Sequence, residues 1–252
     1  MSKQVTGIMG AMPEEIEGLV DLMANVTEVN IGMRTYYSGT LNGNKVVVVF
    51  SRWGKVAAAT TVTTLVLHFG ITELLFTGVA GAVDAGLNIG DVVVAQRLVQ
   101  HDMDARPLLP RFEVPLLQKT YFETDEALRA RAVKAVEYLV ESRHLHQLTE
   151  NRFLQKFGIE KPAVYTGDIA SGDHFFSNAA AKHRLVEMLP HTLCVEMEGA
   201  AVAQVCYEYR IPFVVIRTIS DTADEHSPLD FPLFVRHIAS RYSVAVVKAM
   251  VS

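Results

Sequence analysis

Short apolar runs of strand length alternate with stretches of helical periodicity along most of this 252-residue chain. The predicted strands lie at residues 5–9, 35–41, 45–51, 74–77, 91–100, 163–168, 192–197 and 213–220. The predicted helices lie at about 13–23, 55–69, 125–141, from 198 onward and 231–250. Strands that alternate with helices build a mostly parallel sheet covered on both faces. Because there is no linker and no internal repeat, we predict one α/β domain over residues 1–252.

Three other stretches of the chain show different patterns. Asn42-Gly43-Asn44 separates two strand-like runs and predicts a hairpin turn. Residues 105–122 contain several prolines and predict an extended loop. Residues 142–162 carry no clear pattern, so they receive no assignment.

Composition excludes several classes of protein. Half of the residues are apolar and 20% are charged, which is too apolar for a disordered chain. The net charge of −5, without blocks of like charge, disfavours unspecific nucleic-acid binding, which depends on clustered cations. Cys194 and Cys206 lie in apolar runs typical of reduced core residues. With neither a signal peptide nor a run long enough to span a bilayer, we expect a soluble cytoplasmic protein that binds no membrane.

Three carboxylates follow predicted strands, at the points where the chain passes from a strand into a helix or loop. Ligands of α/β sheets bind beyond these carboxyl ends of the strands. Glu15 falls inside the apolar stripe of the first predicted helix, where burial would raise its pKa toward that of a general base; the alternative is an exposed acid at a helix start. Glu198 begins the apolar stripe of the helix predicted from residue 198 onward. The helix start would keep its carboxylate ionised, as an acceptor for sugar hydroxyls; the alternative is that Glu198 is a simple helix cap. Asp221 follows an apolar strand with one cation, Arg217, which we expect to meet a carboxylate or a ligand oxygen. Alone, Ser220-Asp221 could equally form a turn or a cap.

Other motifs carry less information. Thr77-Gly78-Val79-Ala80-Gly81 predicts a glycine loop that lets the backbone approach a ligand, but it matches neither a dinucleotide fingerprint nor a phosphate-binding loop. His101-Asp102-Met103-Asp104 could ligate a metal, yet no second ligand cluster supports this. No Ser/His/Asp order or nucleophilic cysteine stands out. We therefore predict neither a metal nor a cofactor.

Seven stretches of the chain carry a family resemblance. They are GIMGAMPEEI (7–16), SRWGKVAAA (51–59), TGVAGAV (77–83), GDVVVAQ (90–96), SGDHFF (171–176), VEMEGAAVA (195–203) and PFVVIRTISDTAD (212–224). In this order they resemble the nucleoside phosphorylase/nucleosidase superfamily, and most closely its bacterial 5′-methylthioadenosine/S-adenosylhomocysteine nucleosidases. The resemblance implies an α/β/α sandwich around a mixed, partly barrel-like sheet. It also implies hydrolysis of an N-glycosidic bond, which releases adenine and a 5-thioribose product.

The resemblance further implies roles for single residues. Glu15 would activate the attacking water, Asp221 would protonate adenine N7, and Glu198 would hold the ribose hydroxyls. Phe175 would stack on adenine, and the backbone of Phe176 would read the adenine edge. The other substrate-binding residues implied are Met12, Trp53, Val79, Met197, Arg217, Ser220 and Phe231.

Water is the expected nucleophile. Phosphorylases of the superfamily hold phosphate with an arginine and a serine, at positions that correspond here to Phe76 and Val79. The Glu14-Glu15 pair adds two like charges that would repel an anion. Three alternatives stay open: a phosphorylase, a hydrolase of 6-amino-6-deoxyfutalosine that shares these motifs, and a nucleoside-binding module without turnover.

The resemblance also implies a homodimer, in which the loop around Ala105 and Leu108 reaches the pocket of the partner subunit. The segment at about 105–165 is longer than is usual in the family. Trp53 and His174 replace smaller residues; Trp53 would narrow the 5′ pocket or stack in it, or would simply pack in the core. These departures leave the preference among the three nucleosides open.

Overall fold

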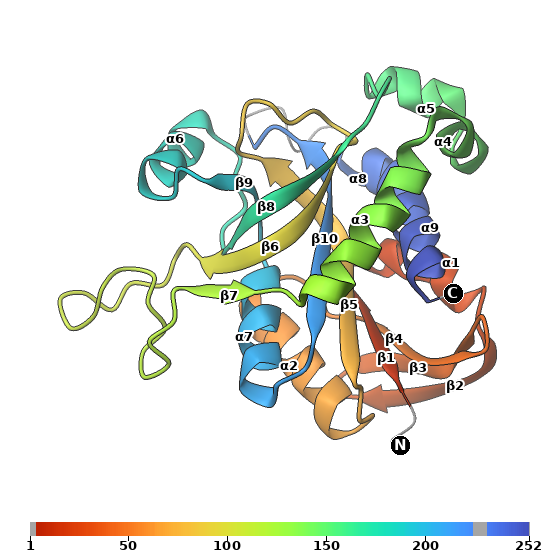
Figure 1. Cartoon of the computed structure of the whole chain (residues 1–252), viewed down its shortest axis with the longest axis horizontal. Coiled ribbons are helices and arrows are strands. Elements are labelled where there is room, and N and C mark those ends of the chain that lie inside the picture. The colour runs from red at the N-terminus through yellow and green to blue at the C-terminus, as the bar shows by residue number, and fades with distance from the viewer. Residues whose placement is uncertain (1–3, 224–230, 252) are drawn as a thin grey trace.

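The computed structural model describes residues 4–223 and 231–251. The strands are β1 (Thr6–Gly10), β2 (Ala24–Ile31), β3 (Arg34–Leu41), β4 (Asn44–Phe50), β5 (Glu73–Ala82), β6 (Val92–Gln100), β7 (Tyr121–Glu123), β8 (Val164–Ser171), β9 (Thr192–Glu196) and β10 (Phe213–Asp221). They form one mixed ten-stranded sheet in the order β10-β6-β8-β9-β5-β1-β4-β3-β2, with β7 on β6. Because β10 also pairs with β5, the strands from β10 to β5 close into a barrel (Figure 1). The predicted mixed, partly barrel-like sheet is confirmed.

Helices cover both faces of this sheet. They are the 3₁₀ turn η1 (Pro13–Glu15), α1 (Glu17–Val20), α2 (Lys55–Leu67), α3 (Glu126–Val140), α4 (Ser142–Leu148), α5 (Asn151–Lys156), α6 (Ala179–Met188), α7 (Gly199–Tyr209), α8 (Phe231–Phe234), the π-helical turn η2 (Val235–Ala239) and α9 (Ser240–Met250). Helix α2 packs on α7, and α3 packs on α9 (Figure 1).

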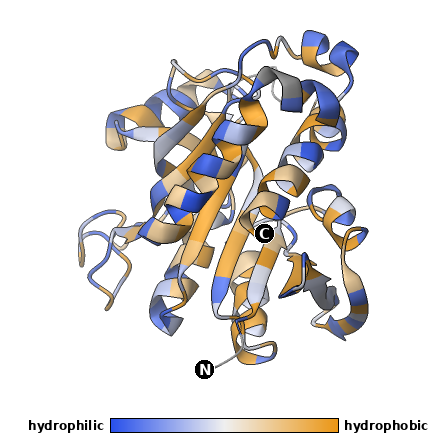
Figure 2. Ribbon diagram, turned by 45° about the vertical axis from the view of Figure 1, so that its right-hand side comes forward, coloured by the Kyte–Doolittle hydropathy of each residue, from blue (hydrophilic) through white to orange (hydrophobic). Residues whose placement is uncertain are grey.

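The central strands are apolar at consecutive positions because both of their faces are buried. Val214 of β10 packs in the cluster that contains α3 and α9, whereas its neighbour Val215 packs in the cluster that contains α2 and α7. Leu75 and Leu74 of β5 divide between the same two clusters. Figure 2 shows these apolar strands between helices whose outer faces are polar. The two cores hold the barrel between two helical layers.

Several sequence predictions hold in detail. The hairpin around Asn42-Gly43-Asn44 joins β3 to β4, and the closing helix continues from α8 through the π-helical turn into α9. Cys194 and Cys206 are buried free thiols. In the described part of the chain, none of the helices has the length and apolarity that a membrane crossing needs.

One predicted element has wrong bounds, and several others were not predicted. The first predicted helix is too long: α1 ends at Val20, and Leu22 is 45% exposed. Strand β2 was not predicted because it is an edge strand exposed on both faces, so that its residues show no alternation. The unassigned residues 142–162 contain α4 and α5, and α6 was also not predicted.

Candidate active site

The ends of β1, β5, β9 and β10 surround a cavity of about 300 Å³. Its walls include every residue that the sequence assigned to catalysis or substrate binding. These are Met12, Glu15, Trp53, Val79, Phe175, Phe176, Met197, Glu198, Arg217, Ser220, Asp221 and Phe231. The remaining wall residues are Ala11, Ala80, Gly81, His174, Val195, Glu196, Ala223 and Pro232. Segments that lie far apart in the sequence therefore meet around one largely apolar space.

Glu15 is held at this cavity by the turn that follows β1. Pro13 opens the 3₁₀ turn, which brings the Glu15 carboxylate back over the end of the strand. Its Oε2 accepts hydrogen bonds from the backbone N–H groups of Ala11 (2.6 Å) and Met12 (3.0 Å). Its Oε1 is buried and has no hydrogen-bond partner in the described structure. One carboxylate oxygen is thus anchored, and the other is left for a ligand or a water molecule.

Burial raises the pKa of Glu15 to about 7, although the positive charge of Arg217 lowers it in part. The predicted direction of this shift is confirmed, and Glu15 is fully buried. The predicted cause, burial, is also confirmed, although Glu15 lies in a 3₁₀ turn and not within the stripe of a long helix.

The glycines at 77–81 lie within β5, so the predicted loop is wrong. A Cβ atom on Gly78 would come within 2.9 Å of Arg217 Nη1 and 3.1 Å of Glu15 Oε1. A Cβ atom on Gly81 would come within 2.9 Å of Asp221 Oδ1. The strand lacks side chains at these points because the charged groups of the site occupy that space.

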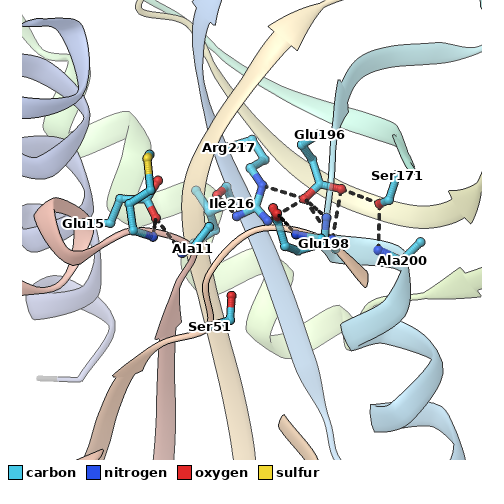
Figure 3. Close-up of polar contacts among 12 residues, drawn as sticks. Ala11, Glu15, Ser51, Ser171, Glu196, Glu198, Ala200, Ile216 and Arg217 are labelled. Carbon is cyan, nitrogen blue, oxygen red and sulfur yellow. Dashed lines mark hydrogen bonds and ion pairs between the residues drawn. The ribbon is translucent and has the colours of Figure 1, made fainter. Parts of the chain in front are cut away.

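Two of the residues that line the cavity, Arg217 and Glu196, form a buried ion pair (Figure 3). Arg217 donates to Glu196 Oε2 from Nη2 (2.7 Å) and Nε (3.3 Å), and its guanidinium lies 3.9 Å from the centre of the Phe76 ring. Glu196 Oε2 also accepts from the N–H groups of Glu198 (3.1 Å) and Gly199 (2.8 Å). The expectation that Arg217 meets a carboxylate is confirmed. Glu196 itself was missed, although an acid in one apolar strand and a cation in another were a signal that the two could pair.

Glu198 directly precedes α7 and is almost fully buried. Its Oε1 accepts a hydrogen bond from the N–H of Gly54 (2.8 Å), which connects it to the loop that carries Trp53. Burial and the nearby negative charge of Glu196 raise the pKa of Glu198. The shift is opposite in direction to the one expected from the helix start, because desolvation and Glu196 both disfavour the charged form.

Asp221 ends β10 and is held on both oxygens. Its Oδ2 accepts from Ser220 Oγ (2.7 Å), and its Oδ1 accepts from the N–H of Ala223 (2.8 Å). Asp221 is buried at the cavity wall, which leaves the group fixed in orientation. Asp224, the last residue of its motif, lies outside the described residues.

Aromatic side chains form the mouth of the cavity. Phe175 is 43% exposed and meets Phe231 edge-on with ring centres 6.3 Å apart. Phe176 is buried behind it, against the His101 ring. Trp53 is 61% exposed and lines the cavity, so it is not a core residue.

Arg34 is a buried cation that the sequence reasoning missed. It donates to the carbonyl oxygens of Ser51 (3.1 Å), Gly32 (2.9 Å) and Ala57 (3.3 Å). These contacts hold the segment between β4 and α2 at both ends. The Arg34 guanidinium therefore helps to hold the loop that carries Trp53, together with the hydrogen bond from Gly54 to Glu198.

Comparison with known proteins agrees with this geometry. A family model described as the phosphorylase superfamily matches residues 5–252. The chain belongs to this superfamily. Among curated relatives of this phosphorylase-superfamily protein, an aminodeoxyfutalosine nucleosidase of Helicobacter pylori is 35% identical over 98% of both chains.

Solved structures of superfamily members show the same fold. An S-adenosylhomocysteine nucleosidase of Streptococcus pyogenes in complex with 5-methylthiotubericidin superposes with a TM-score of 0.84 at 31% identity, covering 99% of this chain and 97% of its own. A futalosine hydrolase of Helicobacter pylori superposes with a TM-score of 0.82 at 34% identity, covering 98% and 97%. These relatives are nucleosidases, and the present superfamily member is an enzyme of this kind, an N-glycosidic hydrolase.

The remaining predicted residues of this nucleosidase lie outside the cavity walls. Asp102 forms an ion pair with Lys55 (2.6 Å), and Asp104 forms one with Arg106 (2.6 Å). Among the described residues, no group of three or more His, Cys, Asp or Glu side chains is placed to hold a metal ion. Leu108 is 87% exposed, and its contact with a partner subunit stays a prediction.

Proposed function

We propose that the protein hydrolyses the N-glycosidic bond of 5′-methylthioadenosine and S-adenosylhomocysteine and releases adenine. The observation that carries the proposal is the convergence of Glu15, Glu198 and Asp221 on one apolar cavity. Cleavage of such a bond passes through a sugar with positive charge and a nucleobase with negative charge. A carboxylate near the sugar can stabilise its positive charge, and a carboxylic acid near the nucleobase can protonate it.

Glu15 is assigned to the attacking water. Its pKa of about 7 is close to the pH at which a general base works best, and Oε1 has no other partner within the described structure. The anchoring of Oε2 by two backbone N–H groups keeps Oε1 aimed at one point. A water molecule bound there would lose its proton to Glu15 as it attacks the anomeric carbon.

Asp221 is assigned to the nucleobase. Its two oxygens are oriented by Ser220 and by the backbone of Ala223, at the end of β10. As an acid that donates to adenine N7, it would let the base depart neutral. Phe175 and Phe176, which line the same cavity, supply the apolar surfaces for the purine.

Glu198 is assigned to the ribose hydroxyls. A carboxyl group can hydrogen-bond to a pair of hydroxyls in either protonation state, so its raised pKa is compatible with this role. Met197 precedes it on the cavity wall and provides an apolar contact for the sugar.

Replacing Glu198 with alanine is expected to lower kcat/KM for 5′-methylthioadenosine by about 10- to 100-fold, because its hydrogen bonds to the two ribose hydroxyls are lost. The control is 2′-deoxy-5′-methylthioadenosine, which lacks one hydroxyl and for which the variant should lose less. An equal loss with both nucleosides, measured by adenine release, would remove Glu198 from the ribose site.

The charges of the cavity favour water over phosphate. Arg217 is the one lysine or arginine among the described cavity-lining residues, and it is bound to Glu196. Phe76 lies against the guanidinium, and Val79 offers no hydroxyl group. A phosphate ion in this space would meet the carboxyl groups of Glu15 and Glu198 without an unpaired cation.

A second candidate function is hydrolysis of 6-amino-6-deoxyfutalosine. It is favoured by the 35% identity to the curated aminodeoxyfutalosine nucleosidase and by the 34% identity to the solved futalosine hydrolase. The same three acids would perform the chemistry, because the two substrates differ in the 5′ substituent and not at the bond that is cleaved.

The deciding experiment measures adenine release in phosphate-free buffer from 5′-methylthioadenosine, S-adenosylhomocysteine and 6-amino-6-deoxyfutalosine side by side. We expect release that needs no phosphate and gives the free sugar. Strict dependence on phosphate, with a sugar 1-phosphate as the product, would show a phosphorylase. The ratio of the three kcat/KM values ranks the two candidate functions.

A further inference from the structure

A second cavity of about 540 Å³ continues outward from the candidate active site. The two cavities share five lining residues: Ala11, Met12, Trp53, Phe231 and Pro232. The second adds Pro13, Glu14, Phe50, Arg52 and Val235. We call this second space the outer groove. It lies at the Met12, Trp53 and Phe231 end of the site, away from Asp221.

Two opposite charges stand out in the otherwise apolar outer groove. Glu14 comes from the 3₁₀ turn that positions Glu15, and Arg52 comes from the loop between β4 and α2. Glu14 and Arg52 are the charged residues among the described lining residues, and no ion pair joins them in the described structure. Neither charge is therefore neutralised by the other.

Arg52 is held in place by its backbone and by its side chain. Its φ of +72° is in the left-handed region, which is uncommon for residues other than glycine and marks a position fixed by its surroundings. Its Nη2 donates to the carbonyl oxygen of Met33 at 2.5 Å. Arg34 holds the same loop through its hydrogen bonds to the carbonyl oxygens of Ser51 and Ala57. The Arg52 guanidinium is therefore anchored to the turn between β2 and β3.

We propose that the outer groove binds the α-amino-acid end of a 5′-thioether nucleoside, with its carboxylate at Arg52 and its ammonium at Glu14. The proposal rests on the proposed function and names the part of the substrate that the outer groove selects. Met12, Trp53 and Phe231 would contact the methylenes between the sulfur and the amino acid. A cation and an anion that line the same apolar groove are complementary to a zwitterion. Glu14 disfavours a tail that ends in a carboxylate alone.

The test compares Arg52→Gln with Arg52→Lys, which keeps the positive charge. Both substitutions place a residue other than glycine at the same left-handed backbone position. For S-adenosylhomocysteine we expect Arg52→Gln to lower kcat/KM about tenfold and Arg52→Lys by less than about threefold. For 5′-methylthioadenosine, which has no charged tail, the expected change is below about twofold in either variant. Adenine release is followed at pH 8.5, because Glu14 contributes to the raised pKa of Glu15 and this pH keeps Glu15 ionised.

Glu14→Gln provides the complementary test. We expect it to lower kcat/KM for S-adenosylhomocysteine about threefold and to raise it about threefold for 6-amino-6-deoxyfutalosine, whose tail carries a carboxylate without an ammonium. If the Arg52 and Glu14 variants affect all three nucleosides alike, or none of them, the zwitterion site is wrong while adenine release still supports the proposed function. If the wild-type protein releases no adenine from any nucleoside, the proposed function and the zwitterion site both fail.

Discussion

Replacing Glu15 with glutamine is expected to lower kcat by about 10²–10⁴-fold, the usual contribution of a positioned general base. Glutamine keeps an oxygen for the N–H groups of Ala11 and Met12, so the turn after β1 retains its shape. It cannot take a proton from water. In the wild-type protein kcat/KM should fall on the acidic side with a pKa of about 7, and this dependence should disappear from the residual activity of the variant.

The same substitution is expected to stabilise the folded protein at alkaline pH. Burial raises the pKa of Glu15 from 4.5 to about 7, so the folded protein binds this proton more tightly than the unfolded chain does. The stability associated with Glu15 is therefore complete below pH 4.5 and is lost as the pH rises through 7. By pH 8 the loss amounts to roughly 3 kcal/mol, which glutamine avoids because it does not ionise.

Urea unfolding at pH 5 and pH 8 measures this effect, with adenine release measured on the same preparations. Glu17→Gln is the matched control, since Glu17 lies two residues away and is exposed. We expect the Glu15→Gln variant to exceed the wild type in free energy of unfolding at pH 8 by more than it does at pH 5, and the control to show no difference. A variant that retains a tenth of the activity would exclude Glu15 as the base. An equal stability gap at the two pH values would contradict its raised pKa.

Predictions from the sequence succeeded where a residue contrasts with its neighbours. A carboxylate among apolar residues indicated the burial of Glu15, and a cation in an apolar strand indicated a carboxylate partner for Arg217. The buried strands β5, β6 and β10 were visible as apolar runs because both of their faces are covered. In each case the feature that determines burial or pairing is visible in the residue and its sequence neighbours.

Predictions failed where the cause lies in contacts between distant segments. The barrel closes because β10 pairs with both β5 and β6, which no local pattern can show, so that only the family resemblance predicted it. The glycines of β5 make room for Glu15 and Asp221, which come from other parts of the chain. The edge strand β2 buries neither face and so lacks the alternation by which strands are recognised. The raised pKa of Glu198 depends on its burial and on Glu196, and the helix start alone predicted the opposite.

Glu196 is the residue whose loss should affect the fold most among those that sequence reasoning missed. Its side chain is 3% exposed and that of Arg217 is 1% exposed, with 2.7 Å between Oε2 and Nη2. Glu196 also accepts from Ser171 Oγ and from backbone N–H groups at the start of α7. The pair therefore joins β8, β9, β10 and α7 at the cavity wall.

We expect Glu196→Gln to destabilise the protein by about 3–5 kcal/mol, because a buried arginine is left without its counter-ion. Glutamine keeps one acceptor oxygen for the backbone of Gly199 but places an NH2 donor at the other position, so the loss combines the missing charge with one missing acceptor. For a domain of this size the melting temperature should fall by about 10 °C. Removing both charges in Glu196→Gln/Arg217→Met should restore part of this loss, since no uncompensated charge remains.

The matched control is Asp104→Asn, which breaks a carboxylate–arginine pair of similar length (2.6 Å) at the surface. Both side chains of that pair are exposed to water, so the melting temperature should not change measurably. Glu196→Gln also leaves a cation unpaired on the cavity wall, and phosphate should then inhibit adenine release by the variant more strongly than by the wild type. If Glu196→Gln is as stable as Asp104→Asn and equally insensitive to phosphate, then Glu196 does not neutralise Arg217. The exclusion of phosphate would then have to come from another group on the cavity wall, such as the carboxyl group of Glu15.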